Sequence, residues 1–259
     1  MAAPELSVVI PVYNEEKRVS SALEGAISYL KSKRMSAEIL VVDDGSKDKT
    51  VEVVQGFKRK CGAKISLKVI RQPVNRGKGA AVQTGALAAK GQVVLYMDAD
   101  NATPLEEFEN FRPALDRGAE VILGSRAVDR KKVKVHQPIY REAMGRVFNL
   151  LVQLLATPGL WDTQCGFKAF TQRAVKAIFP FQTIERFGFD VELLYIARKR
   201  GFKTEEIPIH WYDSPDSRVH VLRDSTRMFL DLLVIRRNDM MGRYDGMGSI
   251  ENGDQEILR

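Results

Sequence analysis

Five short apolar runs, separated by longer segments with helical spacing, constrain the fold of this sequence more than any other feature. Runs that are apolar throughout, rather than alternating with polar residues, are typical of strands buried on both faces of a parallel sheet. The runs lie at residues 6–12, 37–43, 65–71, 92–97 and 119–125. The sequence therefore predicts an α/β half over residues 1–126, with a mostly parallel sheet and helices on both faces.

The segments between the runs predict the covering helices from their apolar spacing and their polar starting residues. Helices are expected over 14–33, from Ser46 or Asp48 to about residue 59, from the Gly-rich turn 75–81 to about residue 90, and over 103–118. Asn14 and Thr103 are the expected N-caps of the first and the last of these helices.

After residue 126 the pattern changes to a basic segment followed mainly by helices. Residues 127–236 are predicted to form a second half of the same domain, and 237–259 to form a flexible tail. Helices are expected over 139–156, 172–178 and 189–200, followed by a strand over 204–212 and a last helix that ends near residue 236. No element is assigned to the segment DTQCGFKAF (162–170).

Composition limits the class of protein. The 259 residues are 44% hydrophobic and carry a formal net charge of +7, enough apolar material for a real core. The positive charge favours nucleic acid, anionic lipid or phosphorylated substrates as partners, or is a solvated surface. Because the basic residues are not interleaved with stacking aromatics and no nucleic-acid motif occurs, we expect no nucleic-acid partner.

Cysteine content and apolar stretches exclude further classes. Two distant cysteines, Cys61 and Cys165, make neither a disulfide framework nor a zinc site, and they fit a cytosolic setting. No secretory signal is visible, and no segment approaches the roughly 18 continuous apolar residues of a membrane span. The stretches 147–156 and 228–235 are each interpreted as a core helix or as a helix that rests on a membrane surface.

Polar clusters follow four of the predicted strands. In parallel α/β sheets, ligands bind at the carboxyl ends of the strands. The clusters are Tyr13-Asn14-Glu15, Asp43-Asp44-Gly45-Ser46, Asp98-Ala99-Asp100 and Gly124-Ser125-Arg126. Four such clusters at one edge of a sheet predict a single pocket.

Asp98 and Asp100 are the candidate metal ligands. Alternate residues of an extended chain point to the same side, so the two carboxylates are expected to share a face and to repel each other unless a cation lies between them. A hard divalent ion, Mg²⁺ or Mn²⁺, with open positions for phosphate oxygens suits this pair. The alternative is an acidic turn that caps the following helix.

The other clusters allow both binding and structural roles. Asp43 or Asp44 can accept hydrogen bonds from a base or ribose, whereas Asp48 and Thr50 are better interpreted as helix-capping residues. The segment NRGKGAA (75–81) is neither a Walker A motif nor a dinucleotide fingerprint. Its glycines permit a tight turn that leaves Lys78, and Arg76 beside it, free to approach phosphate.

The ordered set of motifs resembles glycosyltransferase family 2, whose members have a GT-A fold. The resemblance rests on SVVIPVYNEE, ILVVDDGSKDKT, NRGKGAAVQTGALAAKG, VVLYMDADNAT and LGSR. The later pieces DTQCGFKAF, FGFDVELLYIARKRGFKTEEIPIHW and DSRVH resemble the branch that glycosylates polyprenyl phosphates, nearest to enzymes that glucosylate or mannosylate dolichyl phosphate. The resemblance spans about residues 6 to 235.

The resemblance implies a set of site residues. It implies nucleotide-sugar binding by Pro11, Tyr13, Glu15, Asp43, Asp44, Lys78 and Asp98, and a metal, Mg²⁺ or Mn²⁺, on Asp98 and Asp100. It implies catalytic or phosphate-contacting roles for Asp190, Arg126 and Arg218, and acceptor binding by Arg126, Lys131, Lys132 and Asp162. For Asp162, Asp190 and Glu192, a helix cap or a pair with an arginine is an equally open interpretation.

The implied reaction is metal-dependent, inverting transfer of a hexose, with glucose from UDP-glucose as the first candidate, onto a polyprenyl or dolichyl phosphate. A phosphate acceptor needs no strong general base, whereas a hydroxyl acceptor does, and Asp190 is then the first candidate. Transfer from GDP-mannose, a soluble acceptor, and a nucleotide-sugar-binding or membrane-docking module without turnover are the alternatives.

The resemblance also implies a place of action. Eukaryotic members of this branch carry an N-terminal membrane anchor and bacterial ones carry C-terminal spans, neither of which this sequence shows. The enzyme is then peripheral, or an anchor lies outside this sequence, or the acceptor is soluble. Of these we expect a cytoplasmic protein that lies peripherally on the cytoplasmic face of a membrane, where its partners are the nucleotide-sugar donor and the lipid-phosphate acceptor. The sequence predicts no oligomeric state.

Overall fold

The computed structural model describes residues 3–128, 152–153, 156–212 and 221–245, with the backbone only for 221–226. Within these ranges seven strands form one sheet in the order β3-β2-β1-β4-β6-β5-β7. The strands are β1 (Leu6–Val12), β2 (Ala37–Asp43), β3 (Ile65–Arg71), β4 (Val93–Met97), β5 (Val121–Ser125), β6 (Phe167–Thr171) and β7 (Thr204–Pro208). The neighbours β3-β2-β1-β4 and β5-β7 are parallel, whereas β6 is antiparallel to both β4 and β5.

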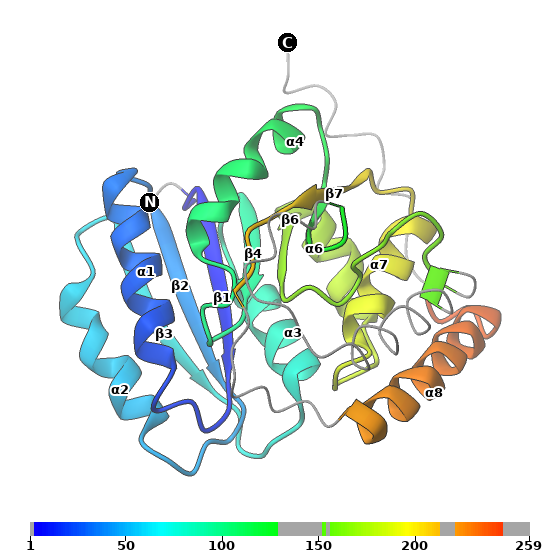
Figure 1. Ribbon diagram of the computed structural model, residues 1–259, viewed down its shortest axis with the longest axis horizontal. Helices are drawn as coiled ribbons and strands as arrows, with labels where there is room; N and C mark the ends of the chain where they lie inside the picture. Colours follow the sequence, from blue (N-terminus) through cyan, green and yellow to red (C-terminus); the bar gives the residue numbers. More distant parts are fainter. Residues whose placement is uncertain (1–2, 129–151, 154–155, 213–220, 246–259) are drawn as a thin grey trace.

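Helices cover both faces of the sheet (Figure 1). They are α1 (Val19–Ser32), α2 (Thr50–Gly56), α3 (Lys78–Ala88), α4 (Arg112–Asp116), α6 (Gln172–Ile178), α7 (Phe189–Lys199) and α8 (Val221–Met240). Short 3-10 turns occupy Phe57–Lys60, Leu105–Asn110 and Phe179–Phe181. Within the described residues, no helix has both the length and the apolar content needed to cross a membrane.

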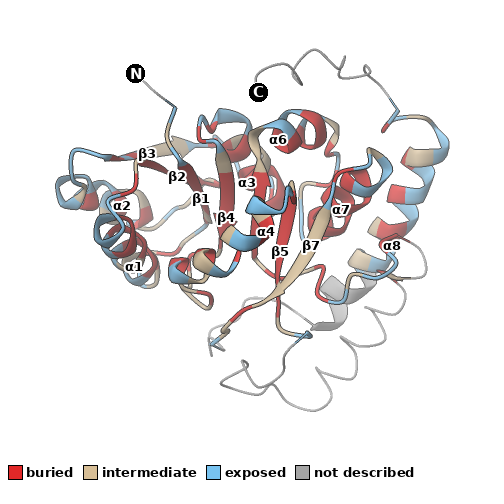
Figure 2. Cartoon of the chain, turned by 90° about the horizontal axis from the view of Figure 1, so that it is seen from above, coloured by how far each residue is buried: buried red, intermediate tan, exposed pale blue. Residues whose placement is uncertain are grey.

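The strands divide their side chains between two cores, one on each face of the sheet. Leu6, Val8 and Ile10 of β1 pack with α1 and α2, whereas Val9 of the same strand packs with the side of α3, α6 and α7. This division follows from the twofold alternation of side chains along a strand. Figure 2 shows the buried sheet between the two helical layers, which confirms the predicted α/β architecture.

The first helix was predicted to start too early. Asn14 is not its N-cap, because Asn14 lies in a loop with a positive φ of 53° and α1 begins at Val19. The loop is held instead by tertiary hydrogen bonds: the Asn14 amide donates to Ser46 Oγ at 2.8 Å, and its side-chain oxygen accepts from the Lys47 amide. Asn14 therefore joins the loop after β1 to the loop after β2 and does not cap α1.

Further predicted elements differ from the structure. The last helix was expected to end near residue 236 with a flexible tail from 237, but α8 continues to Met240, and Asn238 and Tyr244 are buried. The helix expected over 103–118 is a 3-10 turn, Leu105–Asn110, followed by the short α4, and no side chain caps either one. Pro113 near the start of α4 removes a backbone donor, which favours a break in a continuous helix. The strand expected over 204–212 is shorter, Thr204–Pro208, and its last residue lies opposite Ser125, where its partner β5 also ends.

The segment DTQCGFKAF contains the strand that the sequence analysis left unassigned. Residues Phe167–Thr171 form β6, which inserts between β4 and β5 and pairs Tyr96 with Lys168. A segment from the C-terminal half therefore lies in the middle of the sheet built by the N-terminal half. The two predicted halves share one sheet, and this arrangement brings residues 162–168 beside the end of β4.

Candidate active site

The polar clusters that follow β1 and β2 form one hydrogen-bonded structure. Besides the Asn14 contacts, the Glu15 amide donates to Thr50 Oγ1 at 2.7 Å, and the Glu16 amide donates to Asp48. Asp48 also accepts from the Thr50 amide at 3.0 Å, in agreement with its predicted structural role. The carboxyl ends of these two strands thus make a single edge, as the strand-end pattern predicts.

The side chains of the first loop differ in exposure. Tyr13 is exposed and Pro11 half-buried, so both lie within reach of a ligand. Glu15 is nearly buried, and its carboxylate forms an ion pair with Arg18 at 2.6 Å. The roles in nucleotide binding given to Pro11, Tyr13 and Glu15 remain predictions.

Asp43 and Asp44 are buried and hydrogen-bonded to the protein. Both Asp44 oxygens accept from backbone amides, those of Arg76 and Gly77, at 2.8 Å each. Burial is the main cause that raises the pKa of Asp44. Asp43 accepts from the Ser46 amide at 3.0 Å and contacts the Arg71 guanidinium at 3.4 Å. The pair therefore builds the loops of this edge, and direct contact with a base remains a prediction.

The Gly-rich segment 75–81 lies tightly against residues 184–189. Gly77 has a φ of 122°, and a Cβ there would lie 2.5 Å from the Glu185 carbonyl oxygen. Gly79 is equally restricted, by Phe189 and by the Ile184 carbonyl. These close approaches explain the glycines, and they set the N-terminal end of α3, with Lys78 as its first residue, toward the end of β4.

Asp98 and Asp100 lie next to the Lys78 ammonium. The Lys78 Nζ forms an ion pair with Asp98 Oδ1 at 2.6 Å, and the Asp100 carboxylate accepts from the Ala102 amide at 3.0 Å. Burial first, and then the Asp98 charge, raises the pKa of Asp100. Lys78 lies in the field of Asp98, Asp190 and Asp100, which raises its pKa against the opposing effect of burial.

A glycine of the inserted segment completes the surroundings of Asp98. A Cβ at Gly166 would overlap the Asp98 carboxylate at a distance that real Cβ atoms do not show. The backbone just before β6 therefore lies directly against the first acid of the D-x-D pair. This contact is a tertiary one that the spacing of the motifs does not predict.

The carboxylate pair fits a divalent cation that is shared with a ligand. Among the described residues, no group of three or more His, Cys, Asp or Glu side chains is arranged to hold a metal. Mg²⁺ is commonly bound through one or two carboxylates, with phosphate oxygens and water in its remaining positions. The Asp98 charge raises the pKa of Asp100, which indicates repulsion between the two carboxylates. A divalent cation bound to both would reduce this repulsion.

Arg126 and Asp162 form a bidentate pair at the end of β5, in which Asp162 is buried and Arg126 is partly exposed. The Arg126 Nε and Nη2 donate to the two Asp162 oxygens at 2.7 Å each, and the Arg126 amide donates to Asp162 at 2.8 Å. The guanidinium also lies 5.3 Å from the centre of the Trp211 ring. Of the interpretations left open for Asp162, the pair with an arginine is thus present in the structure. Asp162 fixes the orientation of Arg126.

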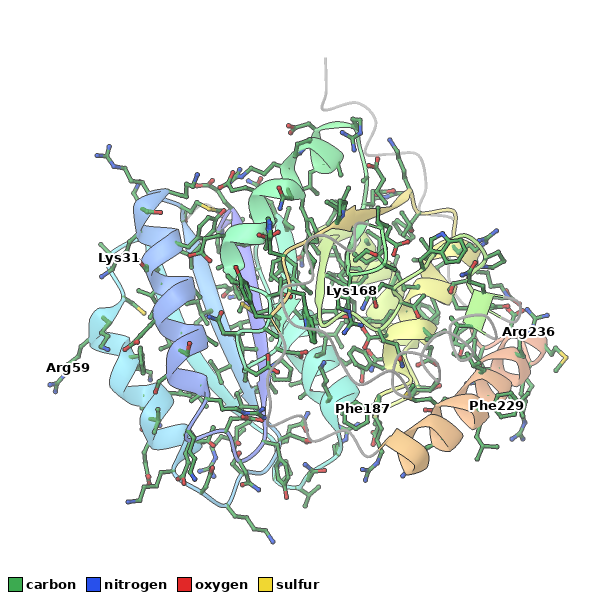
Figure 3. The ribbon with its side chains drawn as sticks, viewed as in Figure 1. Lys31, Arg59, Lys168, Phe187, Phe229 and Arg236 are labelled. Carbon is green, nitrogen blue, oxygen red and sulfur yellow. The ribbon has the colours of Figure 1, made fainter. Side chains whose placement is uncertain are left out.

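Asp190 lies beneath the site in a buried polar cluster. It is only 3% exposed, and its Oδ1 accepts from Lys168 Nζ at 2.6 Å and from the Tyr96 hydroxyl. Lys168 is fully buried, as Figure 3 shows, and it also donates to the Cys165 carbonyl at 2.5 Å. The sequence analysis missed Lys168. The sequence indicates the burial of Lys168 only by its position inside the apolar run FKAF. If this run forms a central strand, its lysine is buried and needs an acidic partner.

Glu192 is a structural residue. Its buried carboxylate accepts from the Thr183 and Ile184 amides at 2.9 and 2.8 Å, from the Thr183 hydroxyl and from the Tyr244 hydroxyl. These bonds tie the segment 183–184 to α7. Three further predicted residues, Lys131, Lys132 and Arg218, lie outside the described residues.

The comparisons with known proteins agree with this architecture. The model of the family described as "Glycosyl transferase family 2" matches residues 7–179. A dolichyl-phosphate beta-glucosyltransferase of Trichomonas vaginalis is 40% identical over 240 residues, which are 89% of this chain and 72% of that protein. The human dolichyl-phosphate beta-glucosyltransferase is 36% identical over 251 residues, 93% of this chain and 77% of that protein.

Solved structures confirm the GT-A fold. Glucosyl-3-phosphoglycerate synthase from Mycobacterium tuberculosis, in complex with Mn²⁺, UDP and phosphoglyceric acid, superposes with a TM-score of 0.67 over 95% of this chain and 80% of its own, at 19% identity. The same synthase has also been crystallised with Mg²⁺ and UDP, and that structure gives a TM-score of 0.63. With the family model matching most of its length, the chain belongs to glycosyl transferase family 2 and is a glycosyltransferase.

Proposed function

We propose that this chain transfers glucose from UDP-glucose to dolichyl phosphate, with Mg²⁺ or Mn²⁺ held by Asp98 and Asp100. The observation that carries the proposal is the carboxylate pair beside the Lys78 ammonium, at the edge of the sheet where ligands of α/β folds bind. The choice of dolichyl phosphate as acceptor and glucose as sugar is supported by relatives at 35–40% identity, which are dolichyl-phosphate beta-glucosyltransferases. The fold neighbours that contain UDP with Mn²⁺ or Mg²⁺ support the donor base and the metal.

The donor diphosphate is proposed to lie between the D-x-D corner and Lys78. A bound divalent cation would supply positive charge to the leaving diphosphate. Lys78 lies at the same corner and adds a second positive charge that is fixed by the start of α3. Tyr13 and Pro11 line the exposed edge nearer β1, where the base and ribose are proposed to bind.

The reaction balances without an added base when the acceptor is a phosphate. An acceptor phosphate oxygen forms the new bond to the anomeric carbon, the bond from that carbon to the diphosphate oxygen breaks, and the electron pair leaves with UDP. Because the attacking oxygen is already anionic, no proton has to be removed. Arg126, held in one orientation by Asp162, is proposed to orient the acceptor phosphate.

The surroundings of Asp190 favour a phosphate acceptor over a hydroxyl acceptor. A general base for a hydroxyl needs a carboxylate within hydrogen-bond reach of the substrate. Asp190 is buried, and its Oδ1 already accepts from Lys168 and Tyr96. We therefore propose that Asp190 supports the site from below and does not act as the base.

The remaining expectations are part of the same proposal. The N-terminal half, residues 1–126, binds the nucleotide sugar, and residues 127–236 contribute the acceptor side. The enzyme works peripherally at the cytoplasmic face of a membrane, where a dolichyl phosphate headgroup is accessible. Lys131, Lys132 and Arg218 are proposed to contact phosphate.

A donor and acceptor panel tests the proposal. UDP-glucose, other UDP-sugars and GDP-mannose are each offered with Mg²⁺, Mn²⁺ or EDTA, against a short-chain dolichyl phosphate in detergent and against 3-phosphoglycerate. We expect glucosylated dolichyl phosphate from UDP-glucose alone, and no product with EDTA. Product from GDP-mannose would overturn the donor assignment, and product only with 3-phosphoglycerate would overturn the lipid acceptor.

A further inference from the structure

Helix α8 exposes apolar side chains to solvent and turns its acidic ones inward. Every exposed side chain that the structure describes on this helix, between Arg227 and Met240, is either a large apolar residue or an arginine. These residues are Arg227, Phe229, Leu230, Leu233, Val234, Arg236, Arg237 and Met240. Leu230 and Leu233 are about half exposed, at 53% and 48%, and Met240 is 79% exposed.

The exposed residues occupy one continuous side of the helix. At 3.6 residues per turn, the apolar group from Phe229 to Val234 covers an arc of roughly 140°. Arg236 and Arg227 lie at the two edges of this arc, and Arg237 lies within it. We call this surface the outer face of α8. Figure 3 shows Phe229 on the side of the helix away from the sheet, whereas Arg236, at the edge of the face, donates a hydrogen bond to the Tyr195 hydroxyl of α7 at 3.1 Å.

The opposite side of α8 is firmly attached to the protein. Leu232 and Ile235 are buried in the core shared with α3, α6 and α7. Asp231 accepts a hydrogen bond from the Gly188 amide at the start of α7, and Asp239 accepts from the Tyr195 hydroxyl at 2.5 Å. Both acidic residues between Arg227 and Met240, where the side chains of α8 are described, are therefore used in internal contacts.

The attachment reaches the neighbourhood of the candidate active site. Met228 lies 3.3 Å from the Gln164 side-chain nitrogen, and Gln164 is two residues from Gly166, which touches Asp98. Gly188, the partner of Asp231, directly precedes α7, which carries Asp190. Phe187, itself exposed, lies next to this contact. The attached side of α8 thus contacts the segments that flank the D-x-D corner and Asp190.

The charge pattern indicates which kind of surface the outer face fits. A contiguous exposed apolar surface on a stable protein marks an interaction site. Helices that lie in a membrane interface combine an apolar face with basic residues beside it, because the apolar side chains enter the acyl region while the basic ones meet anionic headgroups. A patch that binds a second copy of itself would bring the arginines of the two copies together. Asp231 and Asp239 lie in the fields of Arg227 and Arg236, but among the described residues no exposed acid lies beside Arg237 on this face.

We propose that the outer face of α8 docks on an anionic lipid surface and so presents the candidate active site to a lipid-linked acceptor. The proposal rests on the proposed function for the identity of the acceptor. The docking itself depends only on the exposed apolar residues and the arginines at their edges.

Vesicle binding tests the proposal directly. The full chain is sedimented with phosphatidylcholine vesicles that contain about one third phosphatidylserine. The test variant, Leu230→Glu/Leu233→Glu, is compared with Ser21→Glu/Ser28→Glu, which adds the same charge at exposed positions of α1. Because each leucine withdrawn from the apolar phase loses about tenfold in partition, we expect at least about tenfold weaker binding for the α8 variant and less than about twofold for the α1 variant.

Two further measurements keep the result decisive if the double variant folds poorly. Leu230→Ser/Leu233→Ser removes the apolar side chains without adding charge, and a solvent-sensitive dye on Leu233→Cys, in a Cys61→Ser background, reports immersion. Equal vesicle binding by the wild type and both leucine variants, or no spectral change of the dye on vesicles, would overturn the proposal. A wild-type dimer that the leucine variants dissociate, with vesicle binding unchanged, would assign the face to a second copy and also overturn it.

Failure of the proposed function is distinguishable from failure of the docking. Transfer to a water-soluble short-chain acceptor in detergent needs no docking, so the leucine variants should retain the wild-type rate there and lose rate only on vesicle-embedded acceptor. Vesicle binding without any glucose transfer would leave the docking intact and remove the function. Transfer on vesicles that is unaffected by the leucine variants would remove the docking and leave the function.

Discussion

Helices α1 and α8 lie at opposite ends of the molecule and differ in the residues that they expose to solvent (Figure 1). Each packs one side on its neighbours and leaves the other side outward. In α1 the exposed positions are Ser21, Glu24, Ser28, Lys31 and Ser32, all polar. In the part of α8 whose side chains are described, from Arg227 to Met240, the exposed positions are apolar or arginine. The exposed side of α1 is polar, as expected of a surface in contact with water, whereas the exposed side of α8 is largely apolar.

The contrast extends to the halves of the chain that the two helices belong to. In the N-terminal half, the edge loops are joined largely by hydrogen bonds to backbone amides, as between Asn14 and Ser46 or Asp44 and Gly77. The C-terminal half supplies the buried pair of Lys168 with Asp190, and its Asp162 pairs with the partly exposed Arg126 at the end of the N-terminal half. We infer that the first half is built to hold a donor, and that the second half both supports the site and meets a partner.

The largest effect is expected from Asp100→Asn, which acts in the N-terminal half alone. Removing one carboxylate from the proposed metal pair should lower kcat/KM for glucose transfer by at least about a hundredfold. Vesicle binding should not change, because α8 is untouched. The matched control is Asp116→Asn, which changes an exposed aspartate at the end of α4. Equal rates for Asp100→Asn and its control would remove Asp100 from the site.

The next effect is on stability and concerns the buried charges of the C-terminal half. Lys168→Met leaves Asp190 without its cation in a site excluded from water, so the free energy of unfolding should fall by about 3–5 kcal/mol. Lys60→Met breaks an exposed pair with Glu24 and should change it by less than about 1 kcal/mol.

Urea unfolding of the two lysine variants measures this difference. The double variant Lys168→Met/Asp190→Leu should recover part of the loss, since it removes the orphaned charge. A Lys168→Met protein as stable as Lys60→Met would show that the buried pair does not support the fold.

A smaller effect is expected where the two halves meet. Gly166→Ala adds a Cβ that overlaps the Asp98 carboxylate, so the acid must move and transfer should slow by about tenfold or more. Gly56→Ala serves as the control, because no atom lies within 4 Å of a Cβ there. Steady-state rates and donor binding by calorimetry distinguish a displaced Asp98 from a general loss of folding. An unaffected Gly166→Ala enzyme would refute the contact.

The smallest effect is a change in pH dependence at the Arg126–Asp162 pair. Burial raises the pKa of Asp162, but the Arg126 charge and its hydrogen bonds outweigh burial, so the pKa lies below its ordinary value of 3.8. A lowered pKa in the folded state stabilises the protein above pH 3.8, and this stabilisation is lost as the pH falls through the lowered pKa.

Asp162→Asn should therefore be less stable than the wild type at neutral pH and should lose less stability on acidification. Thermal unfolding of both proteins at a series of pH values, from neutral to acid, measures how the stability of each one depends on pH. Parallel curves for the two proteins would contradict the assigned shift.

Much of the N-terminal half could be predicted because its signals are local. The strands 6–12, 37–43 and 65–71 have the bounds that their apolar runs predict. The first two are buried on both faces, whereas β3 lies at the edge of the sheet and alternates between buried and exposed residues at its start. Asn14 was misassigned as a cap because its side-chain oxygen accepts a hydrogen bond from the Lys47 amide in the loop after β2 and not from the start of α1. Local preference was overridden there by a partner 33 residues away.

The C-terminal half was less predictable because its decisive contacts are distant in sequence. The segment 167–171 reads as a short mixed run, and it becomes a strand because β4 and β5 leave a position between them. From sequence alone, a lysine such as Lys168 is expected on the surface. The insertion of β6 between β4 and β5 buries it beside Asp190. The exposure of α8 was also open from sequence, where 228–235 was interpreted as a core helix or a surface one.

By itself, the sequence determined the α/β class, the parallel strands and the chemistry at their ends, because burial on two faces and clustered carboxylates leave their mark on consecutive residues. Only the tertiary structure decided that β6 enters the middle of the sheet, that Lys168 and Asp190 pair beneath the D-x-D corner, and which side of α8 faces outward. The reason is physical: an amphipathic pattern gives a helix two sides, but only packing decides which of them is covered.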